Sequence, residues 1–237
     1  MTLPSLAIIG MGKMGRAVAA LAEERGWPVA ATITADEGPL TRERLRGAEV
    51  AIDFTDRVAA PDNIRACIAA ACPVVVGTTG WYDALPALTV DVVEGGGALL
   101  WAPNFSVGAN IAIEAAAHVA RRIRASGADF DARIIETHHA AKVDAPSGTA
   151  VALERAVAAM WGRDVPVTSI RLGAVPGVHE VIFDGAYEQL RVEHVVRDRR
   201  VFAEGALVAA AWLAAAPRRG VFTMHDVLRG SDPVAGT

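Results

Sequence analysis

Long apolar runs, blocks of basic residues and a cysteine framework are all missing from this 237-residue chain. Hydrophobic residues make up 52% of it, but alanine supplies many of them, and no run approaches the ~20 residues that cross a bilayer. The N-terminal stretch has no basic region or cleavage site, so we expect no signal peptide. The net charge of -4 and the scattered Lys and Arg residues argue against a nucleic-acid or membrane surface.

The two cysteines, Cys67 and Cys72, match neither a C-x-x-C pair nor a disulfide framework. We therefore expect reduced thiols in a core and a cytoplasmic protein. The length allows one large domain or two modest ones, each with its own core.

A glycine-rich turn near the N-terminus predicts a dinucleotide site. The apolar run Leu6–Ile9 precedes it and a helical pattern follows it from Arg16 to Arg25. The turn itself is Gly10-Met11-Gly12-Lys13-Met14-Gly15. Its G-x-G-x-x-G pattern is weak alone, because glycines also simply end strands. In a strand–turn–helix context it lets a pyrophosphate approach the helix N-terminus.

The 2′ end of such a cofactor is poorly specified by the sequence. An acidic residue is expected at the end of the second strand, Val29–Ile33, but the chain continues as Thr34-Ala35-Asp36-Glu37. Asp36 either reaches the ribose from the loop or only faces solvent. Between the end of this strand and Arg42 there is no Lys or Arg, so two acids against Lys13 predict weak discrimination with a lean toward NADH.

Three more apolar segments predict strands of a parallel sheet: Val50–Thr55, Val74–Val76 and Ala98–Trp101. The last two end in loops that we expect to contact the cofactor, because ligands bind at the carboxyl ends of parallel strands. The loop residues are Gly77, Thr78, Thr79, Ala102, Pro103, Asn104 and Phe105. Phe105 either packs against a nicotinamide ring or seals the core.

The pattern changes after residue 106. Two helices and four strands are predicted over Ile111–Ile123, Ala132–Glu136, Ala150–Trp161, Ser169–Leu172, Glu180–Phe183 and Glu188–Val196. The alternation in the last segment marks a strand with one covered face, which indicates a mixed or antiparallel sheet. Few helices remain to cover it, so we expect oligomerisation. An apolar helix, Ala206–Ala216, stops at Pro217 and, with a short element at His225–Leu228, returns to the first domain. The predicted domains are residues 1–106 with 203–237, and residues 107–202.

The stretch from Glu136 to Thr149 concentrates groups suited to binding and protonating a small anion. His138 and His139 can exchange a proton near neutral pH, and Lys142 is a compact cation for a carboxylate. Ser147, Gly148 and Thr149 open a helix with free backbone N–H groups. A single histidine or a single cap is usually structural. Their combination within fourteen residues predicts an active site.

These motifs resemble the 4-hydroxy-tetrahydrodipicolinate reductase family, formerly called dihydrodipicolinate reductase, of the diaminopimelate–lysine pathway. The resemblance runs nearly end to end. It is carried by I-I-G-M-G-K-M-G-R, A-I-D-F-T, V-V-G-T-T-G, A-P-N-F-S-V-G, E-T-H-H-A-A-K-V-D-A-P-S-G-T-A, S-I-R-L-G and F-A-E-G-A-L. The block at 136–150 is specific, whereas the glycine turn is shared by many unrelated enzymes.

The resemblance implies a fold and a set of site residues. The fold is α/β: a Rossmann-type nicotinamide-binding domain plus a smaller α+β substrate domain with a mixed sheet, assembled as a homotetramer. The glycine turn and the two loops resemble contacts of NADH or NADPH. His138 resembles the proton donor, and Lys142 resembles a substrate-holding residue also credited with protonation. His139 resembles a substrate contact, Ser147–Thr149 the cradle of a carboxylate, and Arg199 an arginine near the substrate.

The implied substrate is a cyclic dicarboxylate in which loss of water conjugates an imine with a carbon–carbon double bond. Hydride adds to one end, and a general acid then protonates the neighbouring carbon, a step worth about 10²–10⁴ in rate. Two departures concern the cofactor's adenosine end. The glycine turn is shorter than in many members, and Thr34 and Ala35 replace a Glu-Arg pair.

Two rival interpretations remain. Another two-domain nicotinamide oxidoreductase, such as an aspartate dehydrogenase, would explain the N-terminal half equally well. It would not account for the H-H-x-x-K and P-S-G-T motifs in one block. A nicotinamide-binding redox sensor without turnover usually carries a basic DNA-binding segment, and none is visible.

Overall fold

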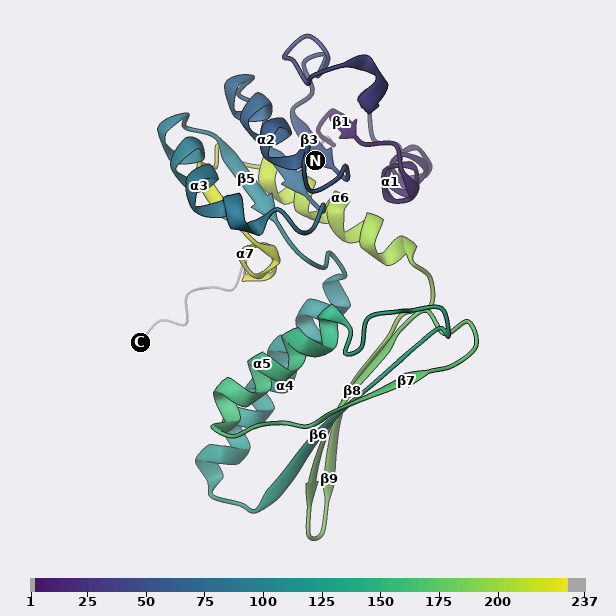
Figure 1. Ribbon diagram of the computed structural model, residues 1–237. Helices are drawn as coiled ribbons and strands as arrows, with labels where there is room; N and C mark the ends of the chain where they lie inside the picture. The colour runs from purple at the N-terminus through teal and green to yellow at the C-terminus, as the bar shows by residue number, and fades with distance from the viewer. Residues whose placement is uncertain (1–2, 230–237) are drawn as a thin grey trace. The chain divides into compact units, whose positions relative to one another are not determined.

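The computed structural model describes residues 3–229, which divide into two compact units (Figure 1). The first unit is formed by the chain up to Phe105 together with the chain from Arg200 onward, and the second extends from Ser106 to Arg199. The sequence had placed these boundaries after residues 106 and 202. Within the described range, no helix is long and apolar enough to cross a membrane.

The first unit is built on a six-stranded parallel sheet in the order β10-β5-β4-β3-β1-β2. The strands are β1 Leu6–Ile9, β2 Val29–Ile33, β3 Val50–Asp53, β4 Val74–Val76, β5 Ala98–Trp101 and β10 Gly220–Phe222. The central strands β1, β3 and β4 are buried throughout and apolar except for Asp53 at the end of β3, because helices cover both faces of a parallel sheet.

The helices of this unit form two groups. They are α1 Lys13–Glu24, α2 Ala60–Ala69, α3 Leu85–Glu94, α6 Arg200–Ala214 and α7 Met224–Arg229. Helices α2 and α3 pack together over one face, where Ile64 and Leu88 join alternate strand residues in a single core. Helices α1 and α6 pack on each other, and α6 contacts β3, β4 and β5. Cys67 and Cys72 are buried free thiols in the α2–α3 core, as predicted.

The second unit is a four-stranded mixed sheet with two helices on one face. Its strands are β6 Phe130–His138, β7 Val167–Arg171, β8 Val178–Gly185 and β9 Gln189–Val195, and its helices are α4 Val107–Ser126 and α5 Gly148–Trp161. The order is β7-β6-β8-β9, and only the β6–β7 pair is parallel. Helices α4 and α5 pack on each other and share a core with Ile134, Val181 and Phe183. Ile170 and Val195 are exposed.

This architecture confirms the predicted fold class, with three differences in the elements. Helix α6 begins at Arg200 rather than at Ala206. Helix α3 and strand β10 were not predicted. Strand β10 has only three residues and follows Pro217, so its identity depends on parallel pairing with β5, more than a hundred residues earlier in the chain.

Candidate active site

The glycine turn after β1 is shaped by two close backbone approaches. Gly10 has a φ of +88°, and a Cβ added to it would lie 2.5 Å from the carbonyl oxygen of Phe54. A Cβ on Gly15 would lie 1.8 Å from the carbonyl oxygen of Gly10. Gly12 instead borders open space and caps α1 without a side chain, which leaves the first N–H groups of the helix available. This geometry fits a pyrophosphate.

The other two predicted cofactor loops lie at the same edge of the sheet, because β1, β4 and β5 are parallel. Gly77 follows β4 beneath the ring of Phe54, and a Cβ there would lie 2.0 Å from that ring. Phe105 is buried, and its ring packs edge-on against Phe54 at 6.2 Å. Its side chain therefore belongs to the core, and a nicotinamide contact by this residue stays a prediction.

Asp53 joins three segments at this edge. Its side chain is fully buried at the end of β3. One oxygen accepts from Thr55 N at 2.9 Å, Thr55 Oγ1 at 2.7 Å and Thr78 Oγ1 at 3.0 Å, and the other accepts from Asn63 Nδ2 at 2.8 Å. Burial raises the pKa of Asp53, although these four donors oppose the shift. The carboxylate thus fixes the loops after β3 and β4 relative to α2.

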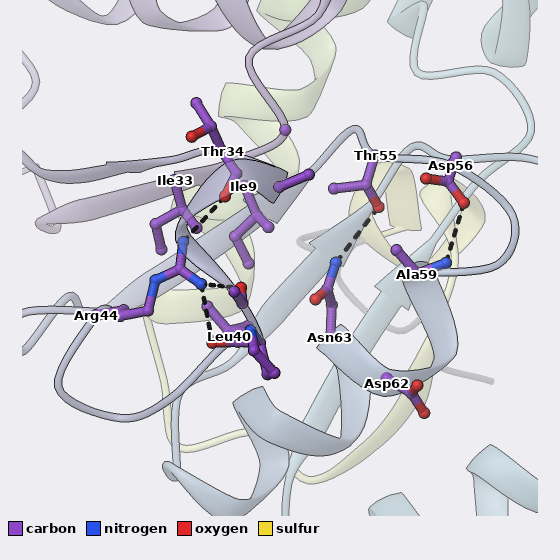
Figure 2. A pocket seen from close by; sticks show the side chains of 14 residues that line it. Ile9, Ile33, Thr34, Leu40, Arg44, Thr55, Asp56, Ala59, Asp62 and Asn63 are labelled. Carbon is purple, nitrogen blue, oxygen red and sulfur yellow. Dashed lines mark hydrogen bonds between the residues drawn. The ribbon is translucent and has the colours of Figure 1, made fainter.

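A pocket of about 310 Å³ lies beyond the ends of β1, β2 and β3 (Figure 2). Its lining includes Gly10, Ile33, Thr34, Thr55, Asp56, Asp62 and Arg44. The Arg44 guanidinium donates to the carbonyl oxygens of Thr34 at 3.0 Å and Pro39 at 2.8 Å, and also to that of Gly38. The glycine turn and this pocket together fit a dinucleotide, with a cation at the adenosine end.

In the second unit, strand β6 carries a histidine–carboxylate pair on its covered face. Burial alternates along β6, which directs Ile134, Glu136 and His138 inward. Glu136 is fully buried, and its Oε2 accepts a hydrogen bond from Nδ1 of His138. An isolated buried charge is costly, so a carboxylate at this position requires partners.

Arg171 supplies the positive charge and also braces the histidine–lysine loop. From the end of β7 its Nη2 donates to Glu136 Oε1 at 2.9 Å and to the Asp144 carbonyl oxygen at 2.6 Å, and its Nε donates to the Lys142 carbonyl oxygen at 3.3 Å. Burial alone would raise the pKa of Glu136, but hydrogen bonds from Arg171, Ser169 and His138 outweigh it and hold the pKa at about 2. Glu136 is therefore ionised.

Ser147 connects the start of α5 to the same cluster. It is buried, and its Oγ caps the helix by accepting from Ala150 N at 3.2 Å. The same oxygen lies 3.0 Å from His179 Nε2, and the rings of His179 and His138 meet edge to face at 5.0 Å. Burial, followed by the nearby His138, lowers the pKa of His179 to about 4, so this ring is neutral.

The remaining predicted substrate residues lie in the turn between β6 and α5. Lys142 Nζ binds both carboxylate oxygens of the exposed Asp144 at 2.8 Å, which uses two of its three donors. His139 is half-buried, and its carbonyl oxygen accepts from Lys142 N at 3.0 Å. Gly148 is exposed at the first position of α5, and Thr149 is half-buried. Arg199 is exposed at the end of this unit.

Glu136, His138 and His179 place ligand-type atoms within 4.8 Å of one another, a spacing that a metal site could use. Arg171 already binds Glu136, and its charge opposes a cation there. The geometry is better explained as a hydrogen-bonded network. Burial lowers the pKa of His138, Lys142 and Arg171 lower it further, and Glu136 opposes the shift.

Five side chains of these sites were not predicted from the sequence to have a role: Asp53, Glu136, Arg171, His179 and Arg44. A local signal existed for the first two, because each is a carboxylate at a buried position of a strand. No local signal marks the other three. They reach their sites through strand pairing or through the loop after β2.

Comparison with known proteins gives a consistent result over both units. Residues 4–105 match the family described as "Dihydrodipicolinate reductase, N-terminus", and residues 108–228 match "Dihydrodipicolinate reductase, C-terminus". A 4-hydroxy-tetrahydrodipicolinate reductase of Gluconobacter oxydans is 36% identical over 97% of this chain and 100% of its own. That of Christiangramia forsetii is 32% identical over 94% and 97%.

Among solved structures, a dipicolinate-bound dihydrodipicolinate reductase from Paenisporosarcina sp. TG-14 has a similar fold. The TM-score is 0.79 over 94% of this chain and 98% of that chain, with 21% sequence identity.

The geometry around Asp53 yields a first prediction. Asp53→Asn should lower the free energy of unfolding by about 1–3 kcal/mol, because its amide NH₂, at a fully buried position, would face another donor. Asp56→Asn is the matched control, since exposed Asp56 accepts only from Val58 N and Ala59 N, which an asparagine oxygen can replace. Urea unfolding measures both variants. Equal stability of the two would show that the Asp53 network is not needed.

Proposed function

Because the chain belongs to the dihydrodipicolinate reductase family, we propose that its two units divide one reaction into cofactor binding and substrate protonation. The enzyme reduces 4-hydroxy-tetrahydrodipicolinate to tetrahydrodipicolinate, with loss of water, in diaminopimelate and lysine biosynthesis, and it depends on a nicotinamide cofactor. The observation that carries the division of labour is the buried His138–Glu136–Arg171 network beside Lys142 and the start of α5.

In the first unit, we assign the cofactor to the edge where the parallel strands end. The N–H groups at the start of α1, from Lys13 to Gly15, would hold the pyrophosphate, and the Gly77–Thr79 and Ala102–Phe105 loops would border the nicotinamide half. When bound, the reduced nicotinamide supplies the hydride. The Asp53 network keeps the Thr78 loop in place.

In the second unit, the substrate's carboxylates need neutralising partners. Lys142 provides an ammonium, and α5, which begins at Gly148, directs the positive end of its helix dipole to the same loop. The Ser147 side chain is used for capping, so its contribution is to fix this helix start. His139 lies in the same turn and completes the substrate contacts. The dipicolinate named in the related structure has the expected chemistry of such a ligand.

His138 delivers the proton. Glu136 occupies its Nδ1, which leaves Nε2 as the exchangeable position, and Gly177 keeps space beside that atom, since a Cβ there would lie 3.1 Å from Nε2. A bound dicarboxylate favours the imidazolium form electrostatically. The acid is therefore charged most readily when substrate is present.

Two further observations support our proposals for the assembly and the compartment. The sheet face opposite α4 and α5 carries exposed Ile170 and Val195, which supports burial of that face between subunits of a homotetramer. Cys67 and Cys72 are buried free thiols that form no disulfide, which suits the reducing cytoplasm.

A coupled assay tests the function and separates it from its rivals. Aspartate semialdehyde and pyruvate, with a synthase, generate the substrate, and oxidation of NADH or NADPH is followed. An aspartate dehydrogenase would instead reduce oxaloacetate in the presence of ammonia, and a redox sensor would bind cofactor without turnover.

The second prediction concerns His138 as the acid. His138→Gln should lower kcat by about 10²–10⁴-fold while cofactor affinity stays unchanged. Exposed His118→Gln is the control. Since the protonated form is active, kcat/KM of the wild type should fall as pH rises, with a midpoint below the usual histidine value of 6.5 because burial lowers the pKa of His138. A variant with more than half the wild-type kcat would refute the assignment.

The third prediction concerns Lys142. Lys142→Ala should weaken competitive inhibition by pyridine-2,6-dicarboxylate by about 10–100-fold, because a carboxylate loses a charged hydrogen-bond partner. Val143→Ala is the control, since this neighbour in the same loop is 97% exposed. Inhibition constants from initial rates measure both. Unchanged inhibition in the lysine variant would place the anion site elsewhere.

The fourth prediction concerns cofactor choice, where Asp36 and Glu37 oppose Lys13 and Arg44. We expect kcat/KM values for NADH and NADPH within about tenfold, with a lean toward NADH, because water screens the charges of the exposed Asp36 and Lys13. Arg44→Met should reduce NADPH use more than NADH use, whereas Arg42→Met, which removes a cation bound to the Ala70 carbonyl, should change neither. A preference for NADPH above tenfold would show that the bases dominate.

A further inference from the structure

Glu136 and Arg171 form an ion pair whose position in the fold makes it more than a structural bridge. It stands between the proton donor His138 and the loop that carries Lys142, and it contacts both. Glu136 is fully buried, so its two oxygens face a fixed set of donors rather than water. The arrangement therefore controls which atoms of His138 carry hydrogen.

The position of hydrogen on His138 follows from the chemistry of the donors and acceptors around it. Arg171 can only donate, and an ionised Glu136 can only accept. The Nδ1 of His138 must then be the donor in its contact with Oε2 of Glu136. In a neutral imidazole only one nitrogen carries hydrogen, so Nε2 is the acceptor and the site that gains and loses the proton.

We propose, on the basis of the function assigned above, that Glu136 held by Arg171 is a positioning residue that keeps His138 protonated on Nδ1, so that Nε2 delivers the proton. In the transfer step the Nε2–H bond breaks and its electron pair stays on the ring. The proton forms a C–H bond with the electron pair of the substrate's carbon–carbon double bond. The ring is left neutral, still bound to Glu136 through Nδ1.

The other groups around the His138 ring do not select its tautomer. His179 on β8 meets His138 edge to face, and its Nε2 is directed to Ser147. Lys142 and Arg171 are positive and disfavour the imidazolium, whereas Glu136 is the one negative group among its electrostatic partners. Glu136 thus has two effects on His138: it selects the tautomer and stabilises the charged ring.

Glu136→Gln tests the proposal with almost no change in shape. The glutamine oxygen must face Arg171, which only donates, so its NH₂ faces His138 and forces Nδ1 to accept. The imidazolium, in which both ring nitrogens donate, would then be disfavoured. We expect kcat to fall about 10²–10⁴-fold, as for His138→Gln. The fall of the remaining kcat/KM with rising pH should move to lower pH.

The control is Glu180→Gln, which alters another carboxylate–arginine pair of the same sheet, the one with Arg191 at 2.8 Å. It should keep the wild-type kcat and pH profile. The double variant Glu136→Gln with His138→Gln should be no slower than His138→Gln alone, because the two residues act as a unit. Multiplied losses, or a Glu136→Gln enzyme with over half the wild-type kcat, would overturn the proposal.

A second measurement needs no altered carboxylate and no turnover. The ¹⁵N spectrum of histidine-labelled wild-type protein reports the tautomer of each of the six histidines, and the His138 signals are identified by their loss in His138→Gln. Hydrogen on Nδ1 in the neutral ring is expected, and hydrogen on Nε2 would refute the positioning role. If His138→Gln remained active while the tautomer was as expected, the proposed function would fail and the positioning would stand.

Discussion

The substrate unit depends on the neutralisation of one buried carboxylate. Glu136 lies where the alternation of β6 places core residues, and a charge there is tolerated only with close partners. Arg171 and His138 are those partners, and each extends the interaction outward. Arg171 binds the carbonyl oxygens of the loop that carries Lys142, and His138 presents its other nitrogen beside Gly177. The site geometry is thus a consequence of satisfying this charge.

Asp53 is the corresponding carboxylate of the cofactor unit, and the comparison shows what the arginine contributes. Both side chains are fully buried, but Asp53 is surrounded by four neutral donors and its pKa is raised, because burial outweighs them. Glu136 has a guanidinium, and its pKa is lowered to about 2. The first arrangement fixes loops without a strong local field. The second maintains a full negative charge beside the histidine that we propose as the acid.

The balance of charges around His138 also connects binding to protonation. Burial and two cations lower its pKa, so much of the population is neutral at neutral pH in the absence of other charges. Under the proposed function, a dicarboxylate at Lys142 and the start of α5 would offset those cations and favour the imidazolium. In this proposal, substrate binding is therefore coupled to charging of the acid through electrostatics.

Local patterns in the sequence determined most of the elements and the contiguous half of the site. Buried strands, the glycine turn, and the block from His138 to Thr149 all follow from periodicity and residue chemistry within a few neighbours. Only the tertiary structure showed that Arg171 and His179 belong to that block. Glu136 is paired with Ser169 on β7 and with His179 on β8, and Arg171 lies opposite His138. Such register is set by long-range packing of the sheet, which no short segment specifies. Strand β10 joined β5 for the same reason.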